Sequence, residues 1–203
     1  MDKLEQAKKN FEEGIKFFQK KEFKQAQFYF EKTLEIAPNS SPTLENLSKS
    51  YLETKDYDKA EKILKYFISL NKEDDQIAYK LLYDIYSSQN KYDDIKNLAN
   101  EAIGKDKLDN EFYLKSKLFY PNFFNSIKEV DAIRKKFNEE VDKLIEKEKI
   151  PNLNLSEKLI KPPNFELSYD GYDNLEINRK LIKLYHKIYP ELNSIEDCYF
   201  SKN

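Results

Sequence analysis

Several residue types are scarce in this chain of 203 residues, and each scarcity excludes a class of function. Only three glycines occur, so the chain has no glycine-rich loop that could cradle a phosphate. Histidine and cysteine occur once each, as His186 and Cys198, and two side chains cannot supply the ligands of a zinc site. They also lack the orienting group that a nucleophile pair needs. We therefore expect no cofactor and no metal, and we assign no catalytic residue.

The charge balance argues against a nucleic-acid partner. The 35 basic residues and 37 acidic residues nearly cancel, and no basic stripe stands out. Arginine occurs only as Arg134 and Arg179, although arginine is the residue that binds phosphates and bases with two parallel hydrogen bonds. We expect no binding to DNA or RNA.

Long apolar runs are absent as well. No run approaches the length needed to cross a bilayer, and residues 1–5 lack the apolar core of a signal peptide. A single cysteine cannot form a disulfide within the chain, which is typical of reducing compartments. These observations predict a cytoplasmic protein with no membrane partner.

What the first half of the chain does contain is a pattern repeated at steps of 34 and then 35 residues. Two columns are aromatic, one is small or aliphatic, and one is mixed apolar. The columns hold Phe17, Tyr51 and Tyr86; Phe23, Tyr57 and Tyr92; Ala26, Ala60 and Ile95; and Phe30, Leu64 and Ala99. A period near 34 residues with such columns is typical of stacked helix pairs.

Each unit of the pattern reads as two helices joined by a turn. We expect units at residues 4–38, 41–72 and 76–104, within a first domain of residues 1–106. Gly14 and Ser48 are the small residues at which two paired helices approach closely. The columns resemble the tetratricopeptide repeat. This resemblance implies an all-α fold, a short superhelix of three helix pairs, and a protein or peptide as the partner.

The first helix of each unit is expected to line a concave groove that binds protein. The projected groove residues are Phe11, Ile15 and Phe18, then Glu45, Lys49 and Leu52, then Lys80, Asp84 and Ser87. The groove would change from apolar to charged along its length, which suits an amphipathic peptide or helix. The alternative is that the N-terminal residues cover Phe11 and Phe18, because terminal repeats need a cap.

Residues 107–203 predict a helical extension or linker, with helices at about 107–118, 127–148 and 174–189. The middle helix has the clearest signal, because Ser126 and Glu129 form a capping box and apolar residues from Ile127 onward follow at three- or four-residue steps. Residues 151–170 read as extended, and residues 191–203 read as loose.

A second resemblance covers about residues 110–192. An aromatic segment at 118–121 ends in a proline, a charged helix follows at 129–148, and two further short segments lie at 163–171 and 188–192. In this order they look like the region that joins repeats to catalytic domain in bacterial SPINDLY-type O-linked N-acetylglucosamine transferases. The resemblance implies that the catalytic domain itself lies on another chain or has been lost.

Three interpretations of function follow. The first is a module that binds a peptide or helix in the groove, as the substrate-selecting part of a glycosyltransferase-like protein. The alternative is one part of a protein O-linked N-acetylglucosamine transferase whose catalytic domain lies on another chain or has been lost. The third is a scaffold that self-associates through exposed aromatic residues such as Phe123 and Phe124.

Overall fold

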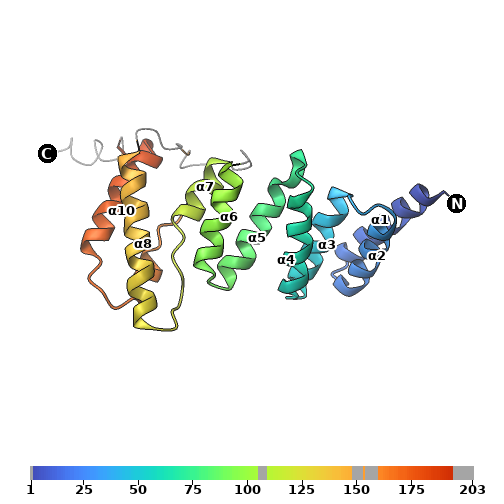
Figure 1. Ribbon diagram of the computed structural model, residues 1–203, viewed down its shortest axis with the longest axis horizontal. Helices are drawn as coiled ribbons and strands as arrows, with labels where there is room; N and C mark the ends of the chain where they lie inside the picture. The colour runs from blue at the N-terminus through green and yellow to red at the C-terminus, as the bar shows by residue number, and fades with distance from the viewer. Residues whose placement is uncertain (1, 105–108, 148–152, 154–159, 194–203) are drawn as a thin grey trace. The chain divides into compact units, whose positions relative to one another are not determined.

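The computed structural model describes residues 2–104, 109–147, 153 and 160–193, and within these residues it contains helices and turns but no strand (Figure 1). The all-α fold class predicted from the repeat pattern, helix pairs with a helical C-terminal extension, is confirmed. The chain divides into two compact units, Met1–Ser88 and Gln89–Asn203.

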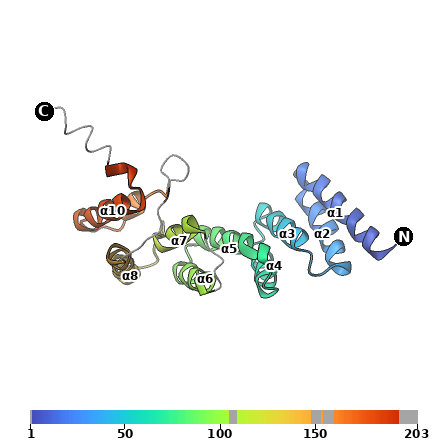
Figure 2. The same cartoon turned by 90° about the horizontal axis from the view of Figure 1, so that it is seen from above.

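The first unit is a series of short amphipathic helices, each packed on its neighbour in the sequence. Its elements are α1 (Lys3–Gln19), α2 (Phe23–Ile36), α3 (Ser41–Glu53), α4 (Tyr57–Ser69), a short 3-10 turn η1 (Glu73–Asp75) and α5 (Gln76–Ser88). Contacts join α1 to α2, α2 to α3, α3 to α4 and α4 to α5, and Figure 2 shows α1 and α2 lying side by side. Stacking supplies the core, since one pair cannot bury its own apolar face.

The turns within the helix pairs share one backbone geometry. Lys21, Lys55 and Asn90 all have a positive φ, of 61°, 59° and 55°, and they follow one another at the same steps of 34 and 35 residues. At the first of these turns the amide of Glu22 donates to the Phe17 carbonyl and the amide of Lys21 donates to the Phe18 carbonyl, each at 2.9 Å. This hydrogen-bond pattern closes a helix through one left-handed residue.

Close approach of α1 and α2 depends on Gly14. The Phe30 ring occupies the space that a side chain at position 14 would fill, because a Cβ built there would lie 2.5 Å from Phe30 Cε1. Phe30 is fully buried, and its ring centroid lies 5.9 Å from that of Phe11. The missing side chain of Gly14 therefore sets the spacing of the first pair.

Two tyrosines of the first aromatic column connect successive helices. The Tyr51 hydroxyl on α3 donates to the Glu31 carboxylate on α2. The Tyr86 hydroxyl on α5 donates to the Glu61 carboxylate on α4 at 3.1 Å. Both rings are buried, so each tyrosine joins an apolar contact to a charge-assisted hydrogen bond.

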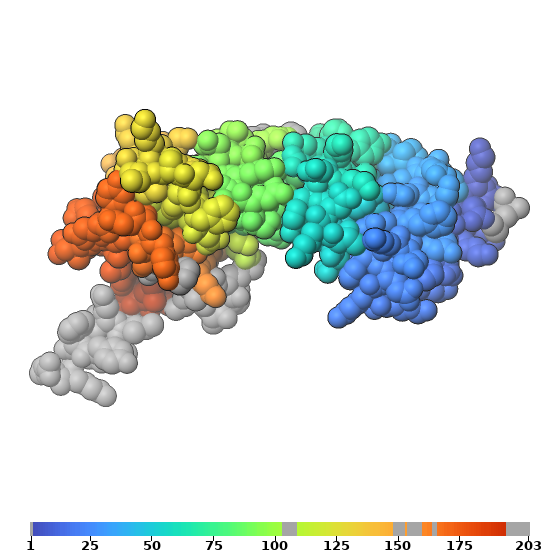
Figure 3. Space-filling model, turned by 90° about the horizontal axis from the view of Figure 1, so that it is seen from below, coloured from blue at the N-terminus to red at the C-terminus, as the bar shows by residue number. Residues whose placement is uncertain are grey.

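The second unit is built on two longer helices that run parallel. Its elements are α6 (Tyr92–Gly104), α7 (Asn110–Lys117), α8 (Ile127–Glu146), α9 (Asn164–Leu167) and α10 (Leu175–Ile188). The polar contacts between the long helices pair Arg134 with Asn174, Asp142 with Lys180, and the carbonyls of Ile145 and Lys147 with Lys187. These contacts progress in the same direction along both helices, so α8 and α10 are parallel, and Figure 3 shows them side by side.

The capping box at the start of α8 forms with one change. The Ser126 hydroxyl accepts from the amide of Glu129 at 3.2 Å, as expected. The Glu129 carboxylate, however, accepts from the amide of Asn125 at 2.7 Å, one residue before the cap. Ile127 is 75% exposed, although its three-residue spacing from Val130 predicted that it would be buried with the rest of the apolar stripe. As the first residue of α8, Ile127 lies before the turns that pack on the core.

One further difference from the sequence expectations concerns local structure. Residues 151–170 were expected to be extended, but 164–167 form the helical turn α9, in which the Leu167 amide donates to the Pro163 carbonyl at 2.9 Å. The boundary between the two compact units lies between Ser88 and Gln89, so α6 belongs to the second unit. The expected domain division at 106/107 stays a prediction, and most of residues 191–203 lie outside the described part.

We expect Gly14→Ala to destabilise the first unit by up to about 2 kcal/mol. The added methyl group clashes with Phe30, which costs about 1–3 kcal/mol in a packed core, and alanine's better helix propensity offsets only about 1 kcal/mol. Urea unfolding followed by circular dichroism measures the change. Ser48→Ala is the matched control in the second pair: its Cβ is already accommodated, so a change within about 1 kcal/mol is expected. Equal effects of the two substitutions would contradict this account.

Candidate protein-binding site

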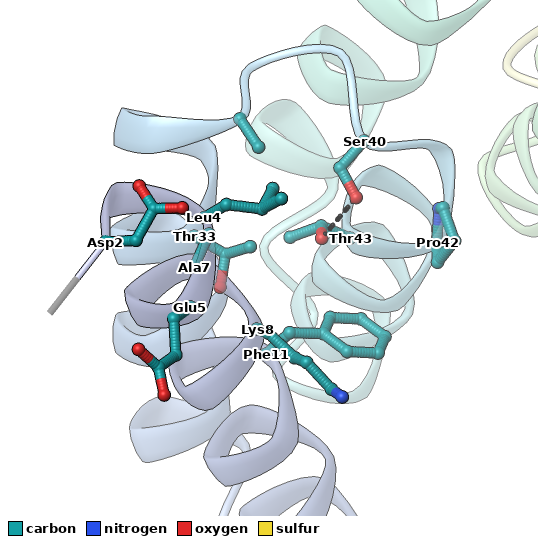
Figure 4. A pocket seen from close by; sticks show the side chains of 11 residues that line it. Asp2, Leu4, Glu5, Ala7, Lys8, Phe11, Thr33, Ser40, Pro42 and Thr43 are labelled. Carbon is teal, nitrogen blue, oxygen red and sulfur yellow. Dashed lines mark hydrogen bonds between the residues drawn. The ribbon is translucent and has the colours of Figure 1, made fainter.

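A hollow of about 490 Å³ opens between α1, the end of α2 and the start of α3, all in the first unit (Figure 4). Most of the surface of its wall is apolar, and charged residues from the first turns of α1 stand at its rim. The described lining residues are Asp2, Leu4, Glu5, Ala7, Lys8, Phe11, Thr33, Ala37, Ser40, Pro42 and Thr43. The size falls within the range of about 300–1,000 Å³ that is typical of ligand pockets.

Helix periodicity and the α1–α2 contact place the wall residues. Leu4, Ala7 and Phe11 are spaced by three and four residues, so they share one face of α1. Phe11 is held by its contact with Phe30. Pro42 stands in the first turn of α3, where proline fits because that turn needs no amide donor.

The polar groups of the wall are already bonded within the protein. The Ser40 and Thr43 hydroxyls lie 2.8 Å apart and pair with each other, as Figure 4 shows. The Thr33 hydroxyl donates to the Tyr29 carbonyl of its own helix at 2.9 Å. Their hydrogen-bonding capacity is therefore partly used, and the hollow presents mainly apolar surface. Such a site suits an apolar side chain better than a polar small molecule.

Of the nine groove residues expected from the sequence, Phe11 is the one among the described lining residues of this hollow. Ile15 and Phe18 are half-buried and continue the same face of α1, and the Phe18 ring meets Phe23 edge-on at 5.4 Å. On α3, Glu45 and Lys49 form a salt bridge at 2.6 Å. Leu52, Lys80 and Ser87 are half-buried and Asp84 is exposed.

The alternative, that the N-terminal residues cover Phe11 and Phe18, stays a prediction, and it concerns residues 3–10. They form the first turns of α1 itself, and the Leu4 side chain at the rim of the hollow is 72% exposed. The sequence projection missed Leu4 and Pro42. The spacing of Leu4, Ala7 and Phe11 was a readable signal, whereas the approach of Pro42 depends on tertiary packing.

In the second unit, Lys96 is partly buried and its ammonium group contacts backbone carbonyls. Lys96 on α6 donates to the carbonyls of Ser116 and Lys117 at the end of α7, at 2.7 Å each, and its ammonium lies 4.8 Å from the centre of the Tyr92 ring. Burial lowers the pKa of Lys96 to about 7, while the nearby Glu140 carboxylate acts in the opposite direction. Its bonds to two carbonyls satisfy the C-terminus of α7, which is a structural role.

A second buried polar group is centred on Asp170, whose side chain is fully buried. The Arg134 guanidinium on α8 pairs with it, the Tyr120 hydroxyl donates to it at 3.0 Å, and the Tyr172 amide donates to it at 3.0 Å. Arg134 also donates to Asn174 Oδ1 at 2.7 Å. Every oxygen of this carboxylate has a donor, so the network fixes the chain before α10 and needs no reactive role.

The remaining candidate features are a metal site, a membrane-spanning helix, the pair of His186 and Cys198, and the exposed aromatic residues. They contain no cluster of three His, Cys, Asp or Glu side chains that could hold a metal, and no described helix is long and apolar enough to cross a bilayer. His186 Nδ1 lies 2.7 Å from Asn193 Oδ1, and Cys198 falls outside the described part. Of the two aromatics suggested for self-association, Phe123 is 61% exposed, whereas Phe124 packs edge-on against Tyr120 at 5.6 Å.

The helix pairs and their turns define a helical-repeat protein. Residues 17–81 match the family model described as the tetratricopeptide repeat, which spans the end of α1 to the middle of α5. This part of the chain is therefore similar to the tetratricopeptide repeat, a class of stacked helix pairs that generally presents protein-binding surfaces. No curated protein and no solved structure matched the chain. The resemblance to glycosyltransferases is therefore not supported by any related protein found in these comparisons.

The depressed pKa of Lys96 makes stability depend on pH in a defined direction. The folded pKa of about 7 lies below the ordinary value of 10.5, so the unfolded chain binds the extra proton between these values. Stability relative to Lys96→Met should therefore rise from pH 7.5 to 9.5, by at most about 1.4 kcal/mol per pH unit. Urea unfolding of both proteins at several pH values measures this, and parallel pH profiles would refute it.

Loss of Arg134, the ion-pair partner of Asp170, should strongly lower the free energy of unfolding. Arg134→Met leaves a buried carboxylate without its cation, which costs about 3–5 kcal/mol of unfolding free energy. Lys136→Met on the same helix is the control, because it removes an ion pair to Asp93 whose side chains are 52% and 75% exposed. That loss should stay below about 1 kcal/mol. Thermal and urea unfolding distinguish the two, and similar losses would show that the Asp170 network contributes little.

Proposed function

We propose that the first unit binds a segment of another protein and takes one of its large apolar side chains into the hollow between α1, α2 and α3. The observation that carries this proposal is the hollow itself: about 490 Å³, walled by Ala7, Phe11, Ala37 and Pro42. A partner Leu, Phe or Met side chain would bury its surface there. Anchors of this kind supply much of the affinity in helix and peptide recognition.

The segment would continue along the groove residues proposed from the sequence. From the hollow, the half-buried Ile15 and Phe18 extend the apolar surface of α1. On α3, the Glu45–Lys49 salt bridge offers both signs of charge. An amphipathic helix or peptide fits this change from apolar to charged, because its apolar face supplies the anchor and its polar face meets the ion pair.

The finer proposal from the sequence is that these repeats select substrates for a glycosyltransferase whose catalytic domain lies on another chain. The residues that suggested it have structural roles here. Tyr120 is buried, and its ring centroid lies 5.1 Å from that of Phe137 on α8. Its hydroxyl donates a hydrogen bond to the Asp170 carboxylate. Core packing alone accounts for this segment, so we extend the proposal no further than protein binding. A cytoplasmic location, suggested by the single cysteine, is part of the proposal.

A peptide display library selected on the full chain provides the test. Enriched peptides should share a large apolar residue, and Phe11→Ser should weaken their binding at least about tenfold, because it removes a central apolar wall residue. Fluorescence anisotropy with labelled peptides measures the affinities. Leu4→Glu gives an independent variant: Leu4 is 72% exposed, so the change places charge at the rim without disturbing the core.

The matched control is Phe28→Ser. Phe28 is 54% exposed on α2 and is not among the described lining residues, so its removal should leave peptide affinity unchanged. Circular dichroism confirms that each variant keeps its helices. Peptides that bind Phe11→Ser and Leu4→Glu as tightly as the native chain would rule out the hollow as the anchor site.

A further inference from the structure

Exposed apolar and aromatic side chains gather at one end of the second unit, where the parallel helices α8 and α10 both begin (Figure 1). The described part of this unit has six large side chains of this kind that are exposed, and five of them belong to this end. They come from the segments that lead into the two helices and from the first residue of each helix. We call them the end patch: Phe123 (61% exposed), Ile127 (75%), Tyr169 (71%), Tyr172 (43%) and Leu175 (56%).

Polar contacts hold the two segments of the end patch beside each other. The Tyr172 hydroxyl donates to the Asp131 carboxylate, one helical turn after Ile127 on α8. The Arg134 guanidinium lies 5.1 Å from the centre of the Tyr172 ring and donates to the Asp173 carbonyl at 2.8 Å. The segment before α10 is thus fixed against the first turns of α8, so the exposed side chains of both segments belong to one surface.

The end patch is as large as one side of a small protein interface. At about 200 Å² for each large side chain, the exposed fractions leave roughly 600 Å² open to solvent. The largest apolar patch on a typical monomeric protein covers about 300–600 Å², so this patch lies at the upper end of that range. Two copies that cover it on each other would remove roughly 1,200 Å² from water, which reaches the lower limit for a stable, specific interface.

The charges beside the end patch suit a second copy of the chain. Lys128 follows Ile127 on α8 and Glu176 follows Leu175 on α10, and both charged side chains are exposed without an ion pair to a described residue. Charges of one sign would repel an identical surface, whereas a lysine and a glutamate can pair reciprocally across a two-fold axis. Nearby acidic side chains already accept hydrogen bonds within the chain: Glu129, Asp131 and Asp173.

We propose that the end patch is the contact surface of a symmetric homodimer, in which this end of the second unit meets the same end of a second copy. Ile127 of one copy lies against Leu175 of the other, and Lys128 pairs with Glu176, each contact occurring twice. Association stops at two copies, because a two-fold interface uses the same surface on both. No described lining residue of the hollow in the first unit belongs to the end patch, so dimer formation is independent of peptide binding there.

Sedimentation equilibrium of the full chain measures the association. The average mass should rise from 24.3 kDa toward twice that value as the concentration increases. An interface at the small end of the range predicts a dissociation constant of roughly 10–100 µM. A native chain that stays monomeric at about 200 µM, well above that constant, would assign the end patch to a lipid surface or a different protein and overturn the proposal.

Substitutions locate the interface. Ile127→Glu combined with Leu175→Glu should weaken the dimer at least about tenfold, because it places unpaired charges at the centre of the contact. Both positions are exposed first residues of helices, where glutamate suits the helix dipole, so the fold should persist. Ile182→Glu is the matched control, since Ile182 is 59% exposed on α10 but lies outside the end patch, and it should leave the dimer unchanged.

Charge reversal tests the two-fold pairing. Lys128→Glu and Glu176→Lys each set like charges opposite one another and should weaken the dimer at least about threefold at low salt. The two reversals combined restore opposite charges and should recover most of the native affinity, and circular dichroism checks that each variant stays helical. The proposal also fails if the double glutamate variant associates like the native chain, if the combined reversal dimerises no better than either single one, or if assembly continues beyond two copies.

Discussion

The contact between Gly14 and the Phe30 ring is the constraint on which the first unit depends. Because position 14 carries no side chain, α1 approaches α2 until the ring fills the space above the glycine. The same ring lies against Phe11, which in turn forms a wall of the hollow beside α3. A substitution at a position remote from any ligand would therefore shift the surface that a ligand meets, since packed interiors transmit small displacements.

The second unit relies on polar interactions that lie close to its apolar core. The last carbonyls of α7 are bound by Lys96, those of α8 by Lys187, and the loop before α10 by Arg134. In each case a basic side chain from one helix satisfies the backbone of another segment. Such contacts are directional, unlike apolar packing, so they select one arrangement of helices among those that would bury similar area.

The sequence predicted the parts of this fold that depend on repeated burial. The aromatic and small columns follow directly from which face of each helix is buried, and Phe30, Leu64 and Ala99 are indeed fully buried. The positive φ of Lys21 and Lys55 left no such signal, because glycine is the residue usually found in that conformation. Here the following helix and its hydrogen bonds impose the turn on a lysine.

The candidate site was predictable only in part. Phe11 was identified because periodicity assigns it to a helix face, but Pro42 reaches the same hollow from another helix, and no pattern within α1 shows this. The partly buried position of Lys96 differs from the usual expectation that lysine is solvated. Only the carbonyls at the end of α7, brought close by the fold, explain it.

The parallel course of α8 and α10 has a consequence for the connection between them. Antiparallel helices need only a short turn, as between α1 and α2, but parallel neighbours require the chain to travel back along the whole first helix. For the 20 residues of α8 this distance is about 30 Å, which at least nine or so extended residues must span. The segment after α8 is therefore a topological requirement of the unit, and a deletion that shortens it below that span would force α10 to reverse direction or leave the core.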